Sequence, residues 1–144
     1  MTRTYRLALM LPLMGALLGA QAAQAADMTL EVQGISANEG QILVAVFAET
    51  KDWLRRPVLV ARADAAEQKN GTLLIQLHDL PEGVLALNVT HDLNGNGRLD
   101  MNAMGLPIEP YGFSNNAVGM FGPPSFEKAA FSVTQGARIA VQLN

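Results

Sequence analysis

One segment of this sequence carries oxygen atoms in a regular pattern. It runs from His91 to Asp100 and reads HDLNGNGRLD. Five of its residues offer oxygen ligands: Asp92, Asn94, Asn96 and Asp100 through their side chains, and Arg98 through its backbone carbonyl. With Gly97 at the sixth position, the spacing matches the first nine positions of a calcium-binding loop, which gathers oxygens around a hard cation. The sequence therefore predicts a Ca²⁺ site formed by these five residues.

The segment departs from the full calcium pattern at its twelfth position. Ala103 stands where a bidentate glutamate would complete the site. Two carboxylates and two amides predict weak binding, with a Kd on the order of 10⁻⁴ to 10⁻³ M, the class of extracellular calcium modules. Glu109 would supply the missing carboxylate if the chain folds back onto the loop.

A second interpretation of the same segment needs no metal ion. Asn94-Gly95 and Asn96-Gly97 are dipeptides typical of turns with positive φ, and Asp92 suits the acceptor position of an Asx turn. His91 precedes the pattern by one residue and has no second histidine nearby. We expect it to be an ordinary strand-end residue rather than a ligand of a transition metal.

A second group of candidate residues follows in the segment 105–126, where aromatic residues are interleaved with glycine, proline and asparagine. Four of the eight aromatic residues of the chain lie there. Aromatic faces and amide side chains suit surfaces that bind sugar rings or peptides. The candidate ligand-binding residues are Tyr111, Phe113, Asn115, Asn116 and Phe121. The structural alternative is that the aromatic side chains pack against the end of the domain and hold a long loop in place.

The rest of the chain predicts a mostly β domain that positions these two segments. Short apolar runs are separated by turn residues, and helical periodicity is nearly absent. Strands are expected at 28–32, 42–47, 58–63, 73–77, 85–89, 129–133 and 139–143. The run 42–47 is apolar on both faces, which predicts a central strand, and 48–56 is expected to form the one helical turn. The number and spacing of the strands predict a single Ig-like or prealbumin-like β-sandwich of about seven strands. The runs 73–77 and 85–89 are expected to pair as a central hairpin, with a long irregular loop over 92–125 after it.

Residues 1–25 resemble a cleavable signal peptide. Arg3 and Arg6 precede an apolar run from Leu7 to Leu18, and small residues follow. The apolar run is shorter than the roughly 20 residues that a membrane-spanning helix needs. We expect cleavage after Ala25, a single domain over 26–144, and a periplasmic or secreted location without a transmembrane anchor.

Composition narrows the partners of this domain. Without Arg3 and Arg6, eight basic and thirteen acidic side chains remain, for a net charge of −5. An acidic domain repels the phosphates of nucleic acid, so we expect no nucleic-acid partner. There is no cysteine in the chain, so neither a disulfide nor a thiolate metal site is available.

The segment beginning at His91 resembles the signature of a family of small exported bacterial proteins, domain of unknown function 2141. The matching tokens are the Asp-x-Asn-Gly-Asn-Gly-x-Leu-Asp loop and three later runs: Gly105-Leu106-Pro107, 109–116 and 122–126. The turn at Leu80-Pro81-x-Gly83 agrees with the same layout. The resemblance implies a secreted or periplasmic β-sandwich with no established activity.

These observations support three hypotheses for the function. The first is a non-catalytic binding or structural domain of the cell envelope with a calcium-type loop. The second is a glycan- or peptide-binding module that uses the loop 105–126, so the partner would be an envelope glycan, peptide or protein. The third, a hydrolase, has least support, because no nucleophile elbow is present and no catalytic residue can be assigned.

Overall fold

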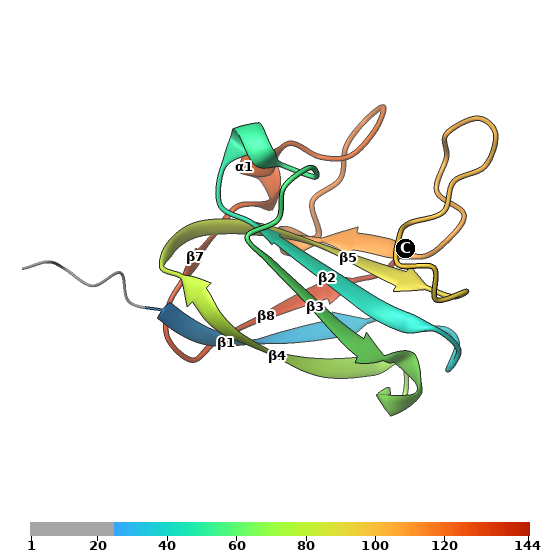
Figure 1. The fold of residues 1–144 in the computed structure, drawn as a ribbon, viewed down its shortest axis with the longest axis horizontal. Coiled ribbons are helices and arrows are strands. Elements are labelled where there is room, and N and C mark those ends of the chain that lie inside the picture. Colours follow the sequence, from blue (N-terminus) through green and yellow to red (C-terminus); the bar gives the residue numbers. More distant parts are fainter. Residues whose placement is uncertain (1–24) are drawn as a thin grey trace, which may run out of the picture.

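The computed structural model describes residues 25–144, which form two β-sheets packed face to face (Figure 1). The expected signal peptide lies outside the described residues, except for Ala25. No helix among residues 25–144 is both long enough and apolar enough to cross a membrane.

The elements are strands, with a few short helical turns between some of them. The strands are β1 (Ala25–Gln33), β2 (Gln41–Phe47), β3 (Leu59–Asp64), β4 (Thr72–Pro81), β5 (Gly83–Asp92), β6 (Tyr111–Phe113), β7 (Phe131–Val133) and β8 (Ala137–Gln142). The helical elements are the 3₁₀ turns η1 (Thr50–Asp52), η2 (Ala65–Glu67) and η3 (Ser114–Asn116) and the single turn α1 (Phe126–Ala129).

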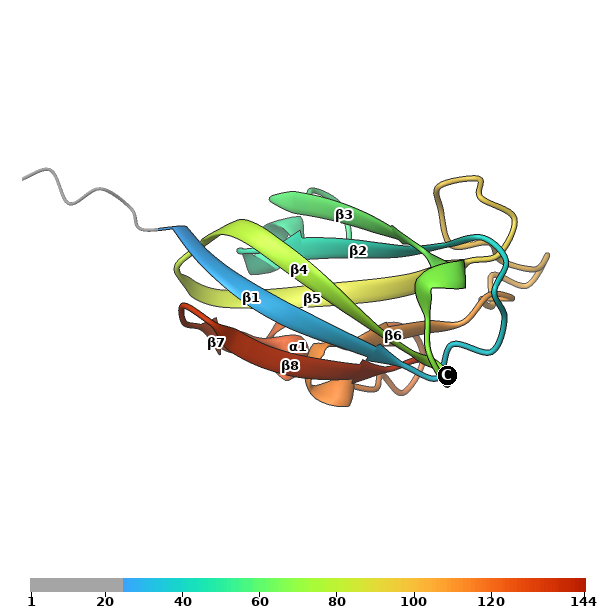
Figure 2. The same cartoon turned by 90° about the horizontal axis from the view of Figure 1, so that it is seen from below.

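The first sheet has the strand order β4-β1-β8, and the second has the order β3-β2-β5-β6, with β7 also paired to β5. All these pairs are antiparallel except β1 with β8. Figure 2 shows the two layers. The predicted mostly β sandwich is confirmed, with eight strands over residues 25–144 where the sequence predicted about seven.

The core lies between the two sheets, and alternation along the strands fills it. In β1, Met28, Leu30 and Val32 are buried while their neighbours are partly exposed. In β2, Ile42, Val44 and Val46 point into the same core. β2 lies between β3 and β5, which confirms the central position that its apolar run predicts.

A second, aromatic cluster lies on the other face of β2. The buried residues Phe47, Phe113 and Phe126 surround the half-buried Trp53, with ring centroids 5.0 to 5.9 Å from that of Trp53. The indole N–H of Trp53 donates to the carbonyl of Pro124 at 2.8 Å. Trp53 therefore packs as a core residue and ties the segment after β2 to the segment before α1.

The predicted hairpin over 73–89 is wrong. β4 and β5 follow each other directly, but β4 pairs with β1 in the first sheet and β5 pairs with β2 in the second. The turn after Pro81 therefore carries the chain from one sheet to the other, as Figure 2 shows where β4 passes into β5. Gly83, with φ of 118°, supplies a backbone conformation that other residues rarely adopt.

The helical turn expected over 48–56 is reduced to η1, three residues long. Leu54 lies just beyond it with φ of 57°. The turn α1 was not predicted; the side chain of Ser125 accepts a hydrogen bond from the backbone N–H of Lys128 and caps its start.

Candidate functional site

Asp92 is the last residue of β5 and is fully buried at the start of the oxygen-rich loop. Its Oδ2 accepts hydrogen bonds from the Gln41 side chain and the backbone N–H of Gly97, each at 2.7 Å. Its Oδ1 accepts the N–H of Asn96 at 3.1 Å. Burial alone would raise the pKa of Asp92, but these hydrogen bonds outweigh it and hold the pKa below the ordinary value of 3.8.

Asp100 closes the other end of the loop. The side-chain amide of Asn96 donates to both carboxylate oxygens at 2.8 Å, and that of Asn94 donates to Oδ2 at 2.6 Å. These hydrogen bonds, followed by the contact with Arg98, lower the pKa of Asp100. The amide oxygens of Asn94 and Asn96 accept the backbone N–H groups of Asn96 and Arg98, each at 3.1 Å.

Glu109 folds back onto this loop, although it lies nine residues beyond Asp100. Its Oε1 accepts the backbone N–H of Leu93 and its Oε2 accepts that of Asp100, each at 2.9 Å. The carboxylate is largely buried. Glu109 therefore joins the two ends of the loop through the backbone, a role that the sequence pattern raised only as a ligand position.

The predicted calcium residues lie together in the loop. Their oxygen atoms suit a hard cation, but only Asp92 and Asp100 supply carboxylates. Among residues 25–144 no three histidine, aspartate or glutamate side chains are grouped so that they could hold a metal ion. An ion between Asp92 and Asp100 would thus depend on amide oxygens. The amide NH₂ groups of Asn94 and Asn96 now face Asp100, so each amide would have to turn over to present its oxygen.

The backbone conformation of the loop Asp92–Asp100 agrees with its interpretation as a series of turns. Gly95 and Gly97 have φ of 72° and 85°. The loop also needs Gly40 beside it, because a side chain at Gly40 would collide with the backbone carbonyl of Asp92. His91 is buried, and its Nε2 lies 2.9 Å from the carbonyl of Glu39. It points away from the loop, because successive strand residues face opposite sides of the sheet.

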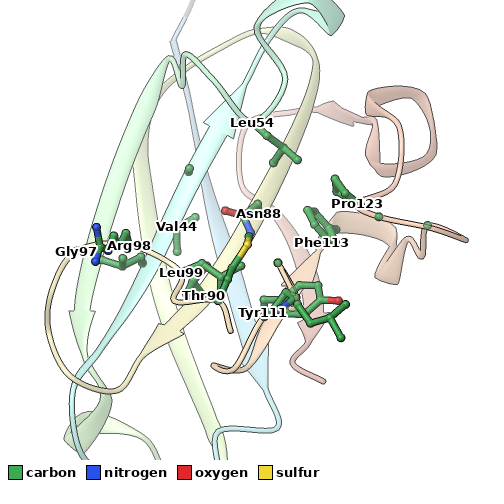
Figure 3. Close-up of a pocket in the computed structure, with 18 of the residues that line it drawn as sticks. Val44, Leu54, Asn88, Thr90, Gly97, Arg98, Leu99, Tyr111, Phe113 and Pro123 are labelled. Carbon is green, nitrogen blue, oxygen red and sulfur yellow. The ribbon is translucent and has the colours of Figure 1, made fainter. Parts of the chain in front are cut away.

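The outer face of the second sheet is hollowed beside this loop. The hollow has a volume of about 940 Å³. Figure 3 shows its lining, with Arg98 on one side and Pro123 on the other. The floor includes Leu43 and Ala45 of β2 and Val60 of β3. The segments 97–107 and 119–123 supply the walls.

The candidate ligand-binding residues divide into two groups. Tyr111, Phe113 and Phe121 line the hollow. Asn115 donates to the backbone carbonyls of Lys128 and Ala130 at 3.2 and 2.7 Å, and Asn116 accepts the N–H of Gln142 at 2.9 Å. Both asparagines also have positive φ, 58° and 48°. Their side-chain amides therefore form hydrogen bonds with backbone groups of this protein.

Sequence reasoning missed most of the apolar wall of the hollow. Several lining residues outside the candidate set have large, exposed apolar side chains: Leu54, Val60, Met101, Met104, Leu106 and Met120. The available signal was the absence of any charged residue from 101–108 and 117–124. Uncharged loop segments of this length with large apolar residues often mark an interaction surface.

Ser114, a member of the run 109–116, is completely buried behind this surface. Its hydroxyl accepts the backbone N–H of Leu87 at 2.9 Å and lies within hydrogen-bond distance of the carbonyls of Leu87 and Ala129, at 3.3 and 2.5 Å. The side chain therefore links β5 to η3 and α1, the elements behind the aromatic end of the hollow.

The fold and the hollow define a small β-sandwich domain with a loop-walled, apolar surface cavity. The chain belongs to the family described as an uncharacterized protein conserved in bacteria (DUF2141), whose model matches residues 30–141. No curated protein and no solved structure matches the chain.

Proposed function

We propose that this domain is a non-catalytic binding module of the bacterial cell envelope and that the hollow on the second sheet is its binding site. The observation that carries the proposal is the hollow itself. Its volume of about 940 Å³ lies within the roughly 300 to 1,000 Å³ of small-ligand sites. Apolar side chains that a domain normally covers remain accessible around it.

Two features support the non-catalytic and exported character of the module. Asp92 and Glu109 accept backbone N–H groups with both of their carboxylate oxygens, which favours a structural role over acid–base chemistry. The basic, apolar and small-residue order of residues 1–25 supports export.

The lining favours an apolar ligand over a glycan. Sugar hydroxyls need several side-chain partners, and the side-chain polar groups of the lining are few: Arg62, Asn88, Thr90, Arg98 and Tyr111. The rest of the lining suits two kinds of ligand. One is a peptide with apolar side chains, and the other is an acyl chain. The glycan alternative of the loop 105–126 is thus the less favoured one.

We also propose that Ca²⁺ binds weakly in the loop Asp92–Asp100. Asp92, Asn94, Asn96, Asp100 and the carbonyl of Arg98 would hold it. The ion would supply positive charge between two carboxylates. Because Gly97 and Arg98 also line the hollow, bound calcium would stiffen one wall of the binding site.

The binding proposal is tested with 1-N-phenylnaphthylamine, a neutral fluorophore that brightens in apolar sites. The expected result is saturable binding by the mature chain that Val60→Glu weakens strongly. Leu74→Glu is the matched control, because Leu74 is exposed to 52% on β4 and Val60 to 55% on β3. Equal binding by both variants, or no binding by the parent, would overturn the proposal.

A further inference from the structure

The hollow contains an unusual distribution of charge. Among residues 25–144, only two that line the hollow are charged, and both are arginines, Arg62 and Arg98. The Nε of Arg98 lies 3.3 Å from the Oδ1 of Asp100, so a carboxylate of the loop already neutralises it. Arg62 forms no ion pair with any side chain among residues 25–144. Within the described part of the chain, Arg62 is thus the one cation of the hollow that has no ion-pair partner.

Arg62 lies at the loop end of the hollow. It stands on the outward face of β3, and its guanidinium lies 3.9 Å from the point where a side chain at Gly97 would begin. From there the floor continues over the apolar residues Leu43 and Ala45 of β2. One end of the site therefore favours an anion and the remainder favours hydrocarbon.

The rim of the hollow is apolar as well. Met104 is 83% exposed, Met120 85% and Phe121 100%, and all three line the hollow. They belong to the two uncharged segments 101–108 and 117–124. These exposed side chains would offer an apolar chain its first contacts with the hollow.

We propose that the hollow binds an amphiphile with one acyl chain and one anionic head group, with the head at Arg62 and the chain along the floor toward Phe121. This ligand class rests on the proposed function, because it occupies the same site. Fatty acids and single-chain phospholipids share this chemistry.

A peptide fits this lining less well than an acyl chain. Each peptide residue brings an N–H and a C=O that need partners when they leave water. The apolar floor offers few such partners, whereas a hydrocarbon chain needs none. Arg62 also matches a ligand that has one anionic head group, whereas a peptide backbone carries neutral amide groups at every residue.

The test measures displacement of 1-N-phenylnaphthylamine by decanoate and by 1-decanol, below the concentrations at which either aggregates. Arg62→Gln is expected to weaken decanoate about three- to tenfold, the loss of a partly exposed charge-assisted contact, and to leave 1-decanol unchanged. Arg138→Gln, on β8 of the other sheet, is the matched control. Equal decanoate affinity in the parent and Arg62→Gln would overturn the inference.

Chain length gives a second readout that does not depend on any variant. Affinity is expected to rise about two- to fourfold per methylene from octanoate to dodecanoate, as hydrocarbon burial predicts. A flat series would overturn the inference even if decanoate binds. Fluorophore binding without either effect would leave the proposed binding site standing and exclude this ligand class.

The two sources of the ligand are separated in the same assay. If 1-decanoyl lysophosphatidate displaces the fluorophore with the same dependence on Arg62, single-chain phospholipids are included among the ligands. If it fails where decanoate succeeds, the site is specific for the carboxylate of a free fatty acid. Both results support an anionic acyl ligand.

Discussion

The Oε2 of Glu109 accepts the backbone N–H of Asp100 at 2.9 Å, and its Oε1 accepts that of Leu93 at the same distance. A single side chain therefore closes the loop that carries the predicted calcium residues. The two N–H groups lie at either end of this loop, so the glutamate fixes its width. Closure by a carboxylate from outside the motif explains how the loop can be ordered without a glutamate at its twelfth position.

Glu109→Ala is expected to lower the free energy of unfolding by about 1 to 3 kcal/mol, because two backbone donors lose a charged acceptor. Urea denaturation measures the change. Glu67→Ala is the control, since Glu67 is exposed at the end of η2. Equal stability of the two variants would show that closure by Glu109 contributes nothing.

Calcium at 1 mM is expected to stabilise the domain relative to a chelator. With a Kd of about 10⁻⁴ M, the gain is about 1.4 kcal/mol, or about 4 to 6 °C in Tm for a domain of this size. Asp100→Asn is expected to lose the gain while remaining folded, because Asp100 is not part of the core. A parent Tm that is the same in chelator and in calcium would rule out the site.

The loop is expected to make stability fall in acid. Asp92 and Asp100 both have pKa values held below 3.8, so their contribution is fully present above the unfolded-state value and is lost as pH falls through the lower folded-state values. Urea unfolding at pH 7, 5, 3.5 and 2.5 measures this loss. Asp100→Asn should reduce the fall below pH 4; an equal fall in this variant and in the parent would place the acid-sensitive groups elsewhere.

Ser114→Ala is expected to destabilise the domain by about 1 to 3 kcal/mol, because the buried N–H of Leu87 loses its acceptor. The exposed Ser132→Ala on β7 is the control and is expected to change stability by less than about 0.5 kcal/mol. Thermal unfolding compares the two. Indistinguishable transitions would mean that the hydroxyl is replaced without cost.

Export is expected to yield a mature chain that begins at Ala26. In the structure β1 begins at Ala25, and Ala26 is buried opposite Leu80 of β4. Cleavage there would leave the paired strand almost intact. Intact-mass analysis of the periplasmic or secreted protein measures the start, and an uncleaved chain in the cytoplasm would contradict the expectation.

Local patterns in the sequence predicted most of the strands, but they missed β6 (Tyr111–Phe113), which lies inside the segment 92–125 that was expected to be irregular. Alternation predicted β1 and the inward faces of β4 and β5, because a strand that buries one face must repeat every two residues. The unbroken apolar run 42–47 predicted the central place of β2. The turn glycines of the loop Asp92–Asp100 were likewise legible, because positive φ favours particular residue types.

Local patterns could not predict which strands pair with one another. The turn at Leu80-Pro81-Glu82-Gly83 suits a hairpin and a crossing between sheets equally well, and only the partners of β4 and β5 distinguish the two. Those partners, β1 and β2, lie about 40 to 55 residues earlier in the chain. No local sequence pattern extends over such a distance.

The sequence by itself determined a β-rich chain with a leader-like start, an oxygen-rich loop and an aromatic segment rich in glycine, proline and asparagine. Only the tertiary structure decided that Glu109 closes the loop and that the side chains of Asn115 and Asn116 form hydrogen bonds with backbone groups. It also decided that Arg62, from a strand that no motif marked, faces the apolar hollow. The physical reason is that such contacts arise between residues distant along the chain, where sheet packing rather than local spacing determines what meets.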